Sequence, residues 1–314
     1  MDPELSVVIP AFNEEDNILP LYTALKGVLG GMQYPYEIIF IDDGTTDKTY
    51  PALKKIHESD SQVKIIKFRK NFGQSAALRA GFDHAKGRII ITLDSDLQND
   101  PSDIPKLVEK LKKEDFDVVC GWRYNRRDPF LKKIFSRLAN WMRTKFTKDT
   151  IHDSGCTLRS YHQDCIKDLE LFGELHRYIP AILQWKGYRI GELKVNHRER
   201  IHGTSKYSWK RLTKGFLDLL VISFWQKYSV RPMHIFGGFG FIMAFVGTLI
   251  TIYLIVERIF YNVGLTDRPL FIMGFFLIVL GIQFLATGII ADILMKIYYG
   301  QSDRKNYLIE KILE

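Results

Sequence analysis

The chain has 314 residues, of which 46% are hydrophobic and 25% are charged, so it is long enough for one globular domain with a substantial remainder. Its cysteines, Cys120, Cys156 and Cys165, lack metal-ligand spacing, and no cleavable signal precedes the apolar run at Leu5. These features argue against a disulfide framework and predict a reducing, cytoplasmic setting.

Short apolar runs alternate with segments of helical length through the first 120 residues. Such alternation is typical of an α/β domain, in which helices wrap a mostly parallel sheet. The predicted strands are Leu5–Pro10, Tyr36–Ile41, Val63–Phe68, Arg88–Leu93 and Asp117–Gly121. The predicted helices lie near Ile18–Leu29, Asp47–Ser59, Gln74–Ala85 and Ile104–Lys113.

Acidic residues follow three of the predicted strands. Asp94 and Asp96 come directly after a strand rich in β-branched residues, at the end where open α/β sheets bind ligands. Two acids one residue apart can reach one Mg²⁺ or Mn²⁺ ion and leave positions free for diphosphate oxygens, although a solvated loop is the alternative. The groups Asn13–Glu15 and Asp42–Gly44 follow the first two strands and suit a base and ribose hydroxyls. No glycine-rich phosphate loop follows a strand.

Four motifs in order resemble those of family 2 glycosyltransferases with a GT-A fold. They are Val8–Glu15 (VIPAFNEE), Ile41–Asp47 (IDDGTTD), Arg69–Gly73 (RKNFG) and Leu93–Gln98 (LDSDLQ). The resemblance implies inverting transfer from a nucleotide-activated sugar, with a Mg²⁺ or Mn²⁺ cofactor on Asp94 and Asp96. The nucleotide-sugar site that it implies consists of Pro10, Asn13, Glu14, Asp42, Asp43, Asn71, Gly73, Asp94, Ser95, Asp96 and Gln98. Within this set, Pro10 and Glu14 are expected near the base and Asp42 on the nucleoside.

Two blocks of the chain are strongly basic. Residues 121–150 contain nine lysines and arginines against two acids, and residues 196–231 contain eight against two. A phosphate-bearing substrate, an anionic membrane or nucleic acid would each suit such blocks. Because both blocks adjoin apolar, membrane-directed segments, and not a recognition helix or an aromatic-studded sheet face, we expect no nucleic-acid partner.

The first basic block has the pattern of an amphipathic helix. Between Arg123 and Lys148, apolar residues recur at helical spacing among lysines and arginines, which favours a helix on the lipid surface. A solvated charged face over an ordinary core contact is the alternative. Arg123, close behind the fifth strand, is instead a candidate ligand for the diphosphate or for an acceptor phosphate.

Two later motifs, His152–Arg159 (HDSGCTLR) and Arg200–Tyr207 (RIHGTSKY), resemble the acceptor side of polyprenyl-phosphate glycosyltransferases. This group includes bactoprenol glucosyltransferases, dolichol-phosphate mannosyltransferases and undecaprenyl-phosphate aminoarabinose transferases. It implies transfer of a hexose from a donor of the UDP-glucose or GDP-mannose class to dolichyl or undecaprenyl phosphate. Arg200, Ser205 and Lys206 offer a fork donor, a hydroxyl and a point charge to that phosphate, with a basic juxtamembrane anchor as the alternative.

Two uncharged stretches of 22 residues, Ile235–Val256 and Leu270–Ala291, lie near the C-terminal end. As helices each would reach about 33 Å, enough to cross a hydrocarbon core of about 30 Å. The balanced charge of the connection between them and the lysines and arginines on the other side predict cytoplasmic termini. Their glycines offer small faces for helix packing or for a homo-oligomer.

These observations divide the chain into four parts. We expect a cytoplasmic GT-A domain over 1–205, an interfacial segment over 206–231, two membrane helices within 232–300 and a cytoplasmic tail over 301–314. In this arrangement the lipid phosphate attacks the anomeric carbon with inversion, while the metal and Arg123 stabilise the departing nucleoside diphosphate.

The catalytic candidates are Asp96, Arg123 and Asp153. Asp153 is a candidate base, but a phosphomonoester is already largely dianionic at neutral pH, so orienting and structural roles stay equally open.

Two other functions share part of the pattern. A processive polysaccharide synthase should carry a Gln-x-x-Arg-Trp motif and more membrane helices, and the sequence has neither. A non-catalytic sugar-nucleotide-binding membrane subunit would differ only in lacking activity. The sequence does not identify the sugar, the nucleotide base, the lipid or the oligomeric state.

Overall fold

The computed structural model describes residues 3–124, 151–167, 173–198, 232–262, 268–299 and 309–313, with the single residues 169, 171 and 264. The predicted acceptor residues Arg200, Ser205 and Lys206, the interfacial segment and the basic pattern after Arg123 lie outside the described residues. The chain forms two compact units, Met1–Leu220 with Lys305–Glu314, and Val221–Arg304.

The first unit is built on a mixed sheet whose described strands have the order β7-β5-β6-β4-β1-β2-β3-β8. The strands are β1 (Leu5–Ala11), β2 (Tyr36–Asp42), β3 (Val63–Phe68), β4 (Ile89–Thr92), β5 (Val118–Arg123), β6 (Arg159–His162), β7 (Ile190–Val195) and β8 (Ile309–Leu313). The strands β1 to β4 are parallel, and the predicted strands match β1 to β5 within two residues. The predicted mostly parallel α/β fold is confirmed.

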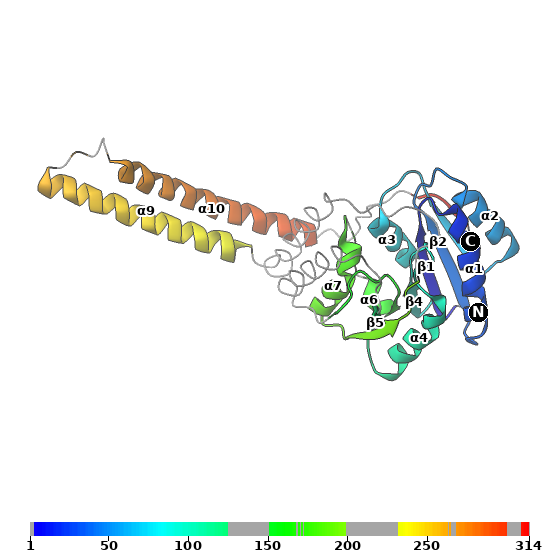
Figure 1. The fold of residues 1–314 in the computed structure, drawn as a ribbon. Coiled ribbons are helices and arrows are strands. Elements are labelled where there is room, and N and C mark those ends of the chain that lie inside the picture. Colours follow the sequence, from blue (N-terminus) through cyan, green and yellow to red (C-terminus); the bar gives the residue numbers. More distant parts are fainter. Residues whose placement is uncertain are drawn as a thin grey trace. The chain divides into compact units, whose positions relative to one another are not determined.

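Helices cover both faces of this sheet (Figure 1). One core lies under α1 (Glu15–Gly30), α2 (Thr49–Ser59) and α4 (Ile104–Lys113). The other lies under α3 (Gln74–His84), α6 (Gln163–Lys167) and α7 (Ile179–Trp185). Neighbouring residues of a strand enter opposite cores: Val7 and Ile9 face the first, whereas Val8 faces the second. The central strands are therefore buried on both sides, as their continuous apolar sequence requires.

Two antiparallel strands were not predicted. Strand β6 lies between β4 and β5, and it brings the segment before Arg159 to the carboxyl ends of the parallel strands. Strand β8 pairs with β3, with Ile312 opposite Ile66, and thus forms an edge of the sheet. Part of the segment 301–314, which we expected as a tail, therefore belongs to the sheet of the first unit.

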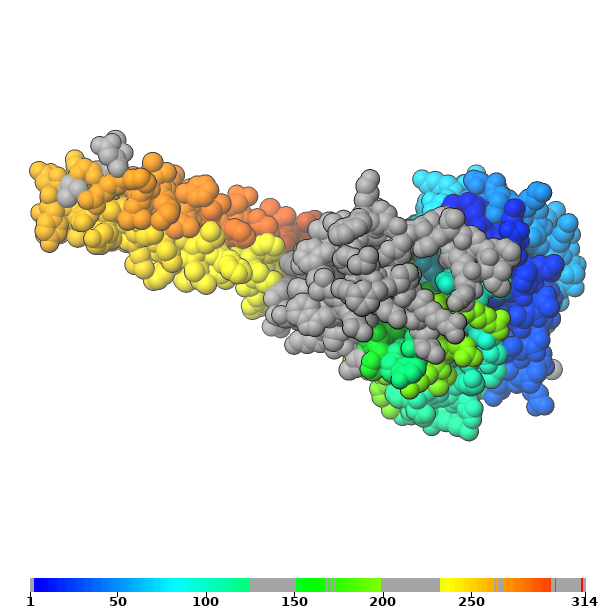
Figure 2. Space-filling view, viewed as in Figure 1, coloured from blue at the N-terminus to red at the C-terminus, as the bar shows by residue number. Residues whose placement is uncertain are grey.

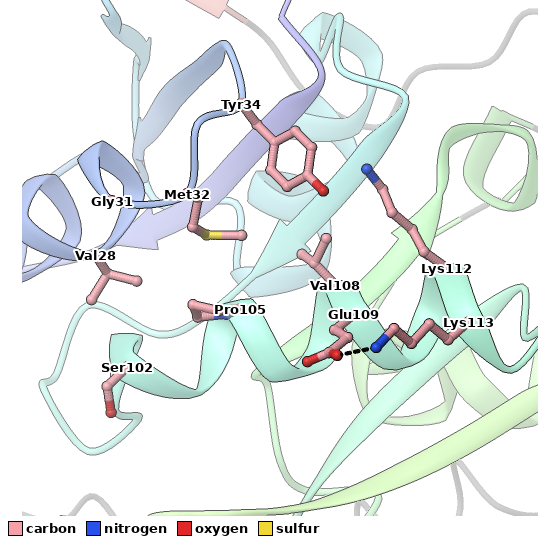
Figure 3. Close-up of a pocket in the computed structure, with 10 residues that line it drawn as sticks. All are labelled: Val28, Gly31, Met32, Tyr34, Ser102, Pro105, Val108, Glu109, Lys112 and Lys113. Atoms are coloured by element: carbon pink, nitrogen blue, oxygen red, sulfur yellow. Dashed lines mark hydrogen bonds and ion pairs between the residues drawn. The ribbon is translucent and has the colours of Figure 1, made fainter.

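A surface groove of about 630 Å³ lies between the end of α1 and α4 (Figure 3). Val28, Met32 and Val108 form its apolar part. Its rim is charged, since Lys113 pairs with Glu109 at 2.5 Å and Lys112 lies 3.9 Å from the ring centre of Tyr34. None of the predicted site residues lines this groove.

The second unit is a pair of long helices, α9 (Met233–Tyr261) and α10 (Pro269–Tyr299). Both are long and apolar enough to cross a membrane. Only 17% and 11% of their most apolar stretches are buried, whereas core helices of a soluble protein would be mostly buried. Large apolar side chains such as Phe241 and Ile272 point outward, while the two helices lie against each other (Figure 2).

Glycines allow the close contact between α9 and α10. A Cβ atom on Gly240 would lie 2.7 Å from the Gly281 carbonyl oxygen, and one on Gly247 would lie 2.6 Å from that of Gly274. The small faces found in the sequence thus pack the two helices of one chain together.

Replacing Gly281 by Leu is expected to separate the helices, because its Cβ would lie 2.6 Å from the Ala244 nitrogen. Overpacking of this kind costs about 1–3 kcal/mol, and thermal unfolding in detergent would measure it as a lower Tm. The matched control is Gly238→Leu, since within the described part of the chain no atom beyond its own helical turn lies within 4 Å of the added Cβ. Equal melting of the two variants would contradict the packing role of Gly281.

Candidate active site

The ends of β1 and β2 are fastened side by side by polar contacts between their loops. Asn13, with φ of 55°, accepts a hydrogen bond from the Thr46 backbone N–H at 2.9 Å. The Glu14 backbone N–H donates to the Thr49 hydroxyl at 2.8 Å. Pro10 lies opposite Ile41 in the register of the two strands. The predicted base-binding residues are therefore brought together.

Asp42 ends β2 with a carboxylate that is only half satisfied. Its Oδ1 atom accepts from the Thr45 backbone N–H at 2.9 Å, whereas its buried Oδ2 atom has no hydrogen-bond partner within the described structure. Burial raises the pKa of Asp42. A buried acceptor without a donor is costly, so Asp42 is suited to receive an N–H or O–H donor from a ligand.

Asp43 ties the end of β2 to the loop that precedes α3. Its carboxylate accepts from the Phe72 N–H at 2.7 Å, from the Gly73 N–H at 3.0 Å and from the Asn71 side-chain amide at 3.0 Å. Burial raises its pKa to about 6. Gly44, with φ of 68°, permits the approach, because a Cβ there would lie 2.2 Å from the Lys70 carbonyl carbon. Asp43, Asn71 and Gly73 thus form one structural cluster.

Asp94 and Asp96 lie in the loop after β4, where Ser95 and Asp96 are buried and Asp94 is half-buried. Asp94 Oδ1 accepts from the Gln74 side-chain amide at 2.7 Å, and Asp96 Oδ1 accepts from the Gln98 N–H at 3.2 Å. Burial and the charge of Asp96 raise the pKa of Asp94 to about 6. Two hard oxygen donors that repel each other in this way fit a divalent cation, which would neutralise both.

Arg123 and Asp153 form a bidentate ion pair beside this loop. Arg123 Nε lies 2.7 Å from Asp153 Oδ2, and Nη2 lies 2.9 Å from Oδ1. The side chains are 13% and 8% exposed, so the pair is largely shielded from water. The positive charge of Arg123 also acts on Asp94. It lowers the pKa of Asp94, whereas burial and the charge of Asp96 raise it. The three catalytic candidates are therefore in one neighbourhood.

Two residues to which no role was assigned from the sequence, Arg159 and Gln74, also contact the segments that form this site. Arg159 is buried in β6, and its guanidinium donates to the carbonyl oxygens of His176 at 3.2 Å and Ser154 at 2.6 Å. Gln74 contacts Asp94 as described. Gln74 directly follows the motif that ends at Gly73, and Arg159 ends the motif that begins at His152, so adjacency was the only available signal.

The residues that follow β7 are hydrogen-bonded to the segment that follows Asp96. The Arg198 N–H donates to the Gln98 carbonyl oxygen at 2.9 Å, and its guanidinium pairs with Asp100 at 2.8 Å. The Asn196 N–H donates to Asp103 at 2.7 Å. Arg198, which precedes Arg200 by two residues in the sequence, therefore lies beside the segment that follows Asp96.

The model of the family described as Glycosyl transferase family 2 matches residues 6–169. A dodecaprenyl-phosphate galacturonate synthase from Rhizobium johnstonii is 39% identical, covering 99% of this chain and 93% of the relative. An undecaprenyl-phosphate 4-deoxy-4-formamido-L-arabinose transferase from Proteus mirabilis is 33% identical, covering 99% and 94%. Similarity at this level extends across both units.

Solved structures share the fold at lower identity. Glucosyl-3-phosphoglycerate synthase from Mycobacterium tuberculosis, in complex with Mn²⁺ and UDP-glucose, aligns with a TM-score of 0.54 at 17% identity over 70% of this chain and 79% of that one. A mannosyltransferase from Pyrobaculum calidifontis, in complex with GDP-mannose and Mn²⁺, aligns with a TM-score of 0.51 at 16% identity over 96% and 80%. Together with the family match, these findings place the chain in glycosyl transferase family 2.

Proposed function

We propose that the protein transfers a sugar, with inversion, from a nucleoside diphosphate sugar to the phosphate of a membrane polyprenyl phosphate. The observation that carries this proposal is the position of Arg198. Arg198 contacts Gln98 and Asp100, which follow Asp96 closely, and in the sequence it precedes by two residues the basic motif that we assign to the acceptor. Relatives named as polyprenyl-phosphate sugar transferases support the acceptor class.

The nucleoside would bind where the ends of β1 and β2 meet. The unpartnered oxygen of Asp42 is available to a donor on the base or the ribose. Pro10, Asn13 and Glu14 border the same position from β1 and the loop after it. The role of Asp43, Asn71 and Gly73 would be indirect. Their contacts with one another would hold the loop before α3 in place beside the nucleoside.

Mg²⁺ or Mn²⁺ would be held by Asp94 and Asp96, and it would supply positive charge to the diphosphate as it leaves. Among the described residues no group of three acidic, histidine or cysteine side chains converges there, so we assign the remaining ligands to diphosphate oxygens and water. Ser95 and Gln98 would complete this loop, since Ser95, between the two carboxylates in the sequence, is buried and the Gln98 N–H donates to Asp96 at 3.2 Å.

The reaction forms a bond between a phosphate oxygen of the lipid and the anomeric carbon, and it breaks the bond from that carbon to the diphosphate. A dianionic phosphate has no proton to lose, so the attack requires no base. Since Arg123 engages both oxygens of Asp153, we assign Asp153 to positioning Arg123, whose charge then faces phosphate. Arg200, Ser205 and Lys206 would hold the acceptor phosphate.

The helix pair α9 and α10 would anchor the enzyme in the cytoplasmic membrane. Strand β8 follows α10 and joins the sheet of the catalytic unit, so both ends of the helix pair connect to that unit. This connectivity supports the topology predicted from charge, in which both termini are cytoplasmic and the connection between the helices is outside.

The test is incorporation of labelled sugar into lipid by the purified full-length protein in vesicles that contain undecaprenyl or dolichyl phosphate. Donors of the UDP-glucose, GDP-mannose, UDP-uronate and UDP-aminosugar classes should be compared with Mg²⁺ and with Mn²⁺. We expect a labelled polyprenyl phospho-sugar with at least one donor and none without the lipid phosphate. Absence of labelled lipid with every donor and both metals would refute the proposal.

A further inference from the structure

Gln74 is the first residue of α3, and its side chain reaches across to the metal loop. Its amide nitrogen donates to Asp94 Oδ1 at 2.7 Å. The Thr157 hydroxyl, which accepts a hydrogen bond from the Asn99 side-chain amide at 2.9 Å, lies near enough to lower the pKa of Asp94. An uncharged donor at the start of α3 therefore contacts a carboxylate in the loop after β4.

The start of α3 is fixed on both sides of Gln74. Before it, the Phe72 and Gly73 N–H groups donate to Asp43. After it, the Ser75 hydroxyl accepts from the buried His176 N–H at 3.1 Å and contacts the His176 ring at 3.0 Å. Because the backbone is held at 72, 73 and 75, the Gln74 side chain leaves from a defined position.

We propose that Gln74 is a positioning residue for the metal-binding carboxylate of Asp94. By occupying Oδ1, it fixes the rotation of the carboxyl group and leaves the remaining lone pairs to the cation. An amide can do this without repelling a divalent ion, whereas a lysine or arginine in the same place would compete with the ion for the carboxylate. This inference rests on the proposed metal site at Asp94 and Asp96.

The arrangement also connects the two halves of the donor site. Asp43 follows β2 and Asp94 follows β4, and these strands are separated by β1 in the sheet. The loop from Asn71 to Gln74 spans this separation, with one end bonded to Asp43 and the other to Asp94. Gln74 thus fixes the position of the proposed metal ligand Asp94 relative to Asp43, at the end of β2 where the nucleoside would bind.

The experiment is a Mn²⁺ titration of the full-length protein, followed by electron paramagnetic resonance of free Mn²⁺, with UDP and separately with GDP present. Gln74→Met keeps the side-chain length but removes the donor, and we expect Mn²⁺ to bind about 10- to 100-fold more weakly at an unchanged Tm. Gln163→Met is the matched control, because the Gln163 amide donates to the Ala85 carbonyl oxygen away from the acidic loop. It should bind Mn²⁺ as the parent protein does.

A second variant, Gln74→Asn, keeps the amide but is too short to reach Asp94, and it should weaken Mn²⁺ binding in the same direction if Gln74→Met does not fold. If folded Gln74 variants bind Mn²⁺ as tightly as the parent protein while Asp94→Asn loses binding, the role of Gln74 is wrong but the metal site stands. Failure of the parent protein to bind Mn²⁺ with either nucleotide would overturn the metal site itself. Parallel loss in Gln163→Met would show that the effect is not specific.

Discussion

Replacing Asp96 by Asn is expected to lower kcat/KM for sugar transfer by about 10²–10³-fold, a size typical of losing one preorganised electrostatic contact to the transition state. The substitution removes one negative charge from the pair that would hold the cation, and with it the neutralisation of the departing diphosphate. The side-chain oxygen that accepts from the Gln98 N–H is retained, so the loop should keep its conformation. Initial rates of lipid labelling against donor concentration would measure the effect.

Asp164→Asn is the control for this prediction. Asp164 is exposed and pairs with Lys167 in α6, away from the strand ends that carry the acidic loop. It should retain the activity of the parent protein. Near-normal activity of a folded Asp96→Asn variant would contradict the assignment of Asp96 to the metal and diphosphate.

Removing one member of the Arg123–Asp153 pair is expected to destabilise the catalytic unit, because the other charge is then left buried without a partner. Such losses amount to about 3–5 kcal/mol, which for a unit of this size corresponds to a fall in Tm of roughly 6–20 °C. Arg123→Met and Asp153→Leu should each show the fall, and the double variant should melt closer to the parent protein. Thermal unfolding of all four proteins in detergent completes the cycle.

Activity separates the two members of this pair. Every protein with Arg123→Met should be inactive, since the guanidinium is the group that would contact phosphate. Asp153→Asn should lower kcat but keep the acidic limb of the pH–rate profile, since the lipid phosphate needs no base. Loss of that limb in Asp153→Asn would instead identify Asp153 as a general base. Additive losses of Tm in the double variant would show that the pair is not coupled.

The sequence was sufficient wherever the determining contacts are local. Strands β1 and β2 are mostly apolar because both of their faces are buried, so the runs at Leu5 and Tyr36 could be recognised without their neighbours. The acidic motifs could be placed at the sheet edge because the carboxyl ends of parallel strands meet there. The two long apolar helices, which could span a membrane, were evident from length and absence of charge alone.

The sequence was insufficient where a strand is short and its partner distant. Strand β6 has four residues, two of them Arg159 and His162, and only its place between β4 and β5 makes it a strand. Strand β8 follows α9 and α10 in the sequence yet pairs with β3, more than 200 residues earlier, as the register of Ile312 with Ile66 shows. No local pattern specifies such a partner.

The amino-acid sequence by itself determined the α/β class, the order of the acidic motifs and the two long apolar helices, because periodicity, strand-end position and length are local properties. Tertiary structure decided which polar groups face each other. Only the folded chain pairs Arg123 with Asp153 and bonds Gln74 to Asp94, and among the described residues it gives one oxygen of Asp42 no donor. These contacts join segments 20 or more residues apart, so their geometry depends on how the sheet brings strand ends together.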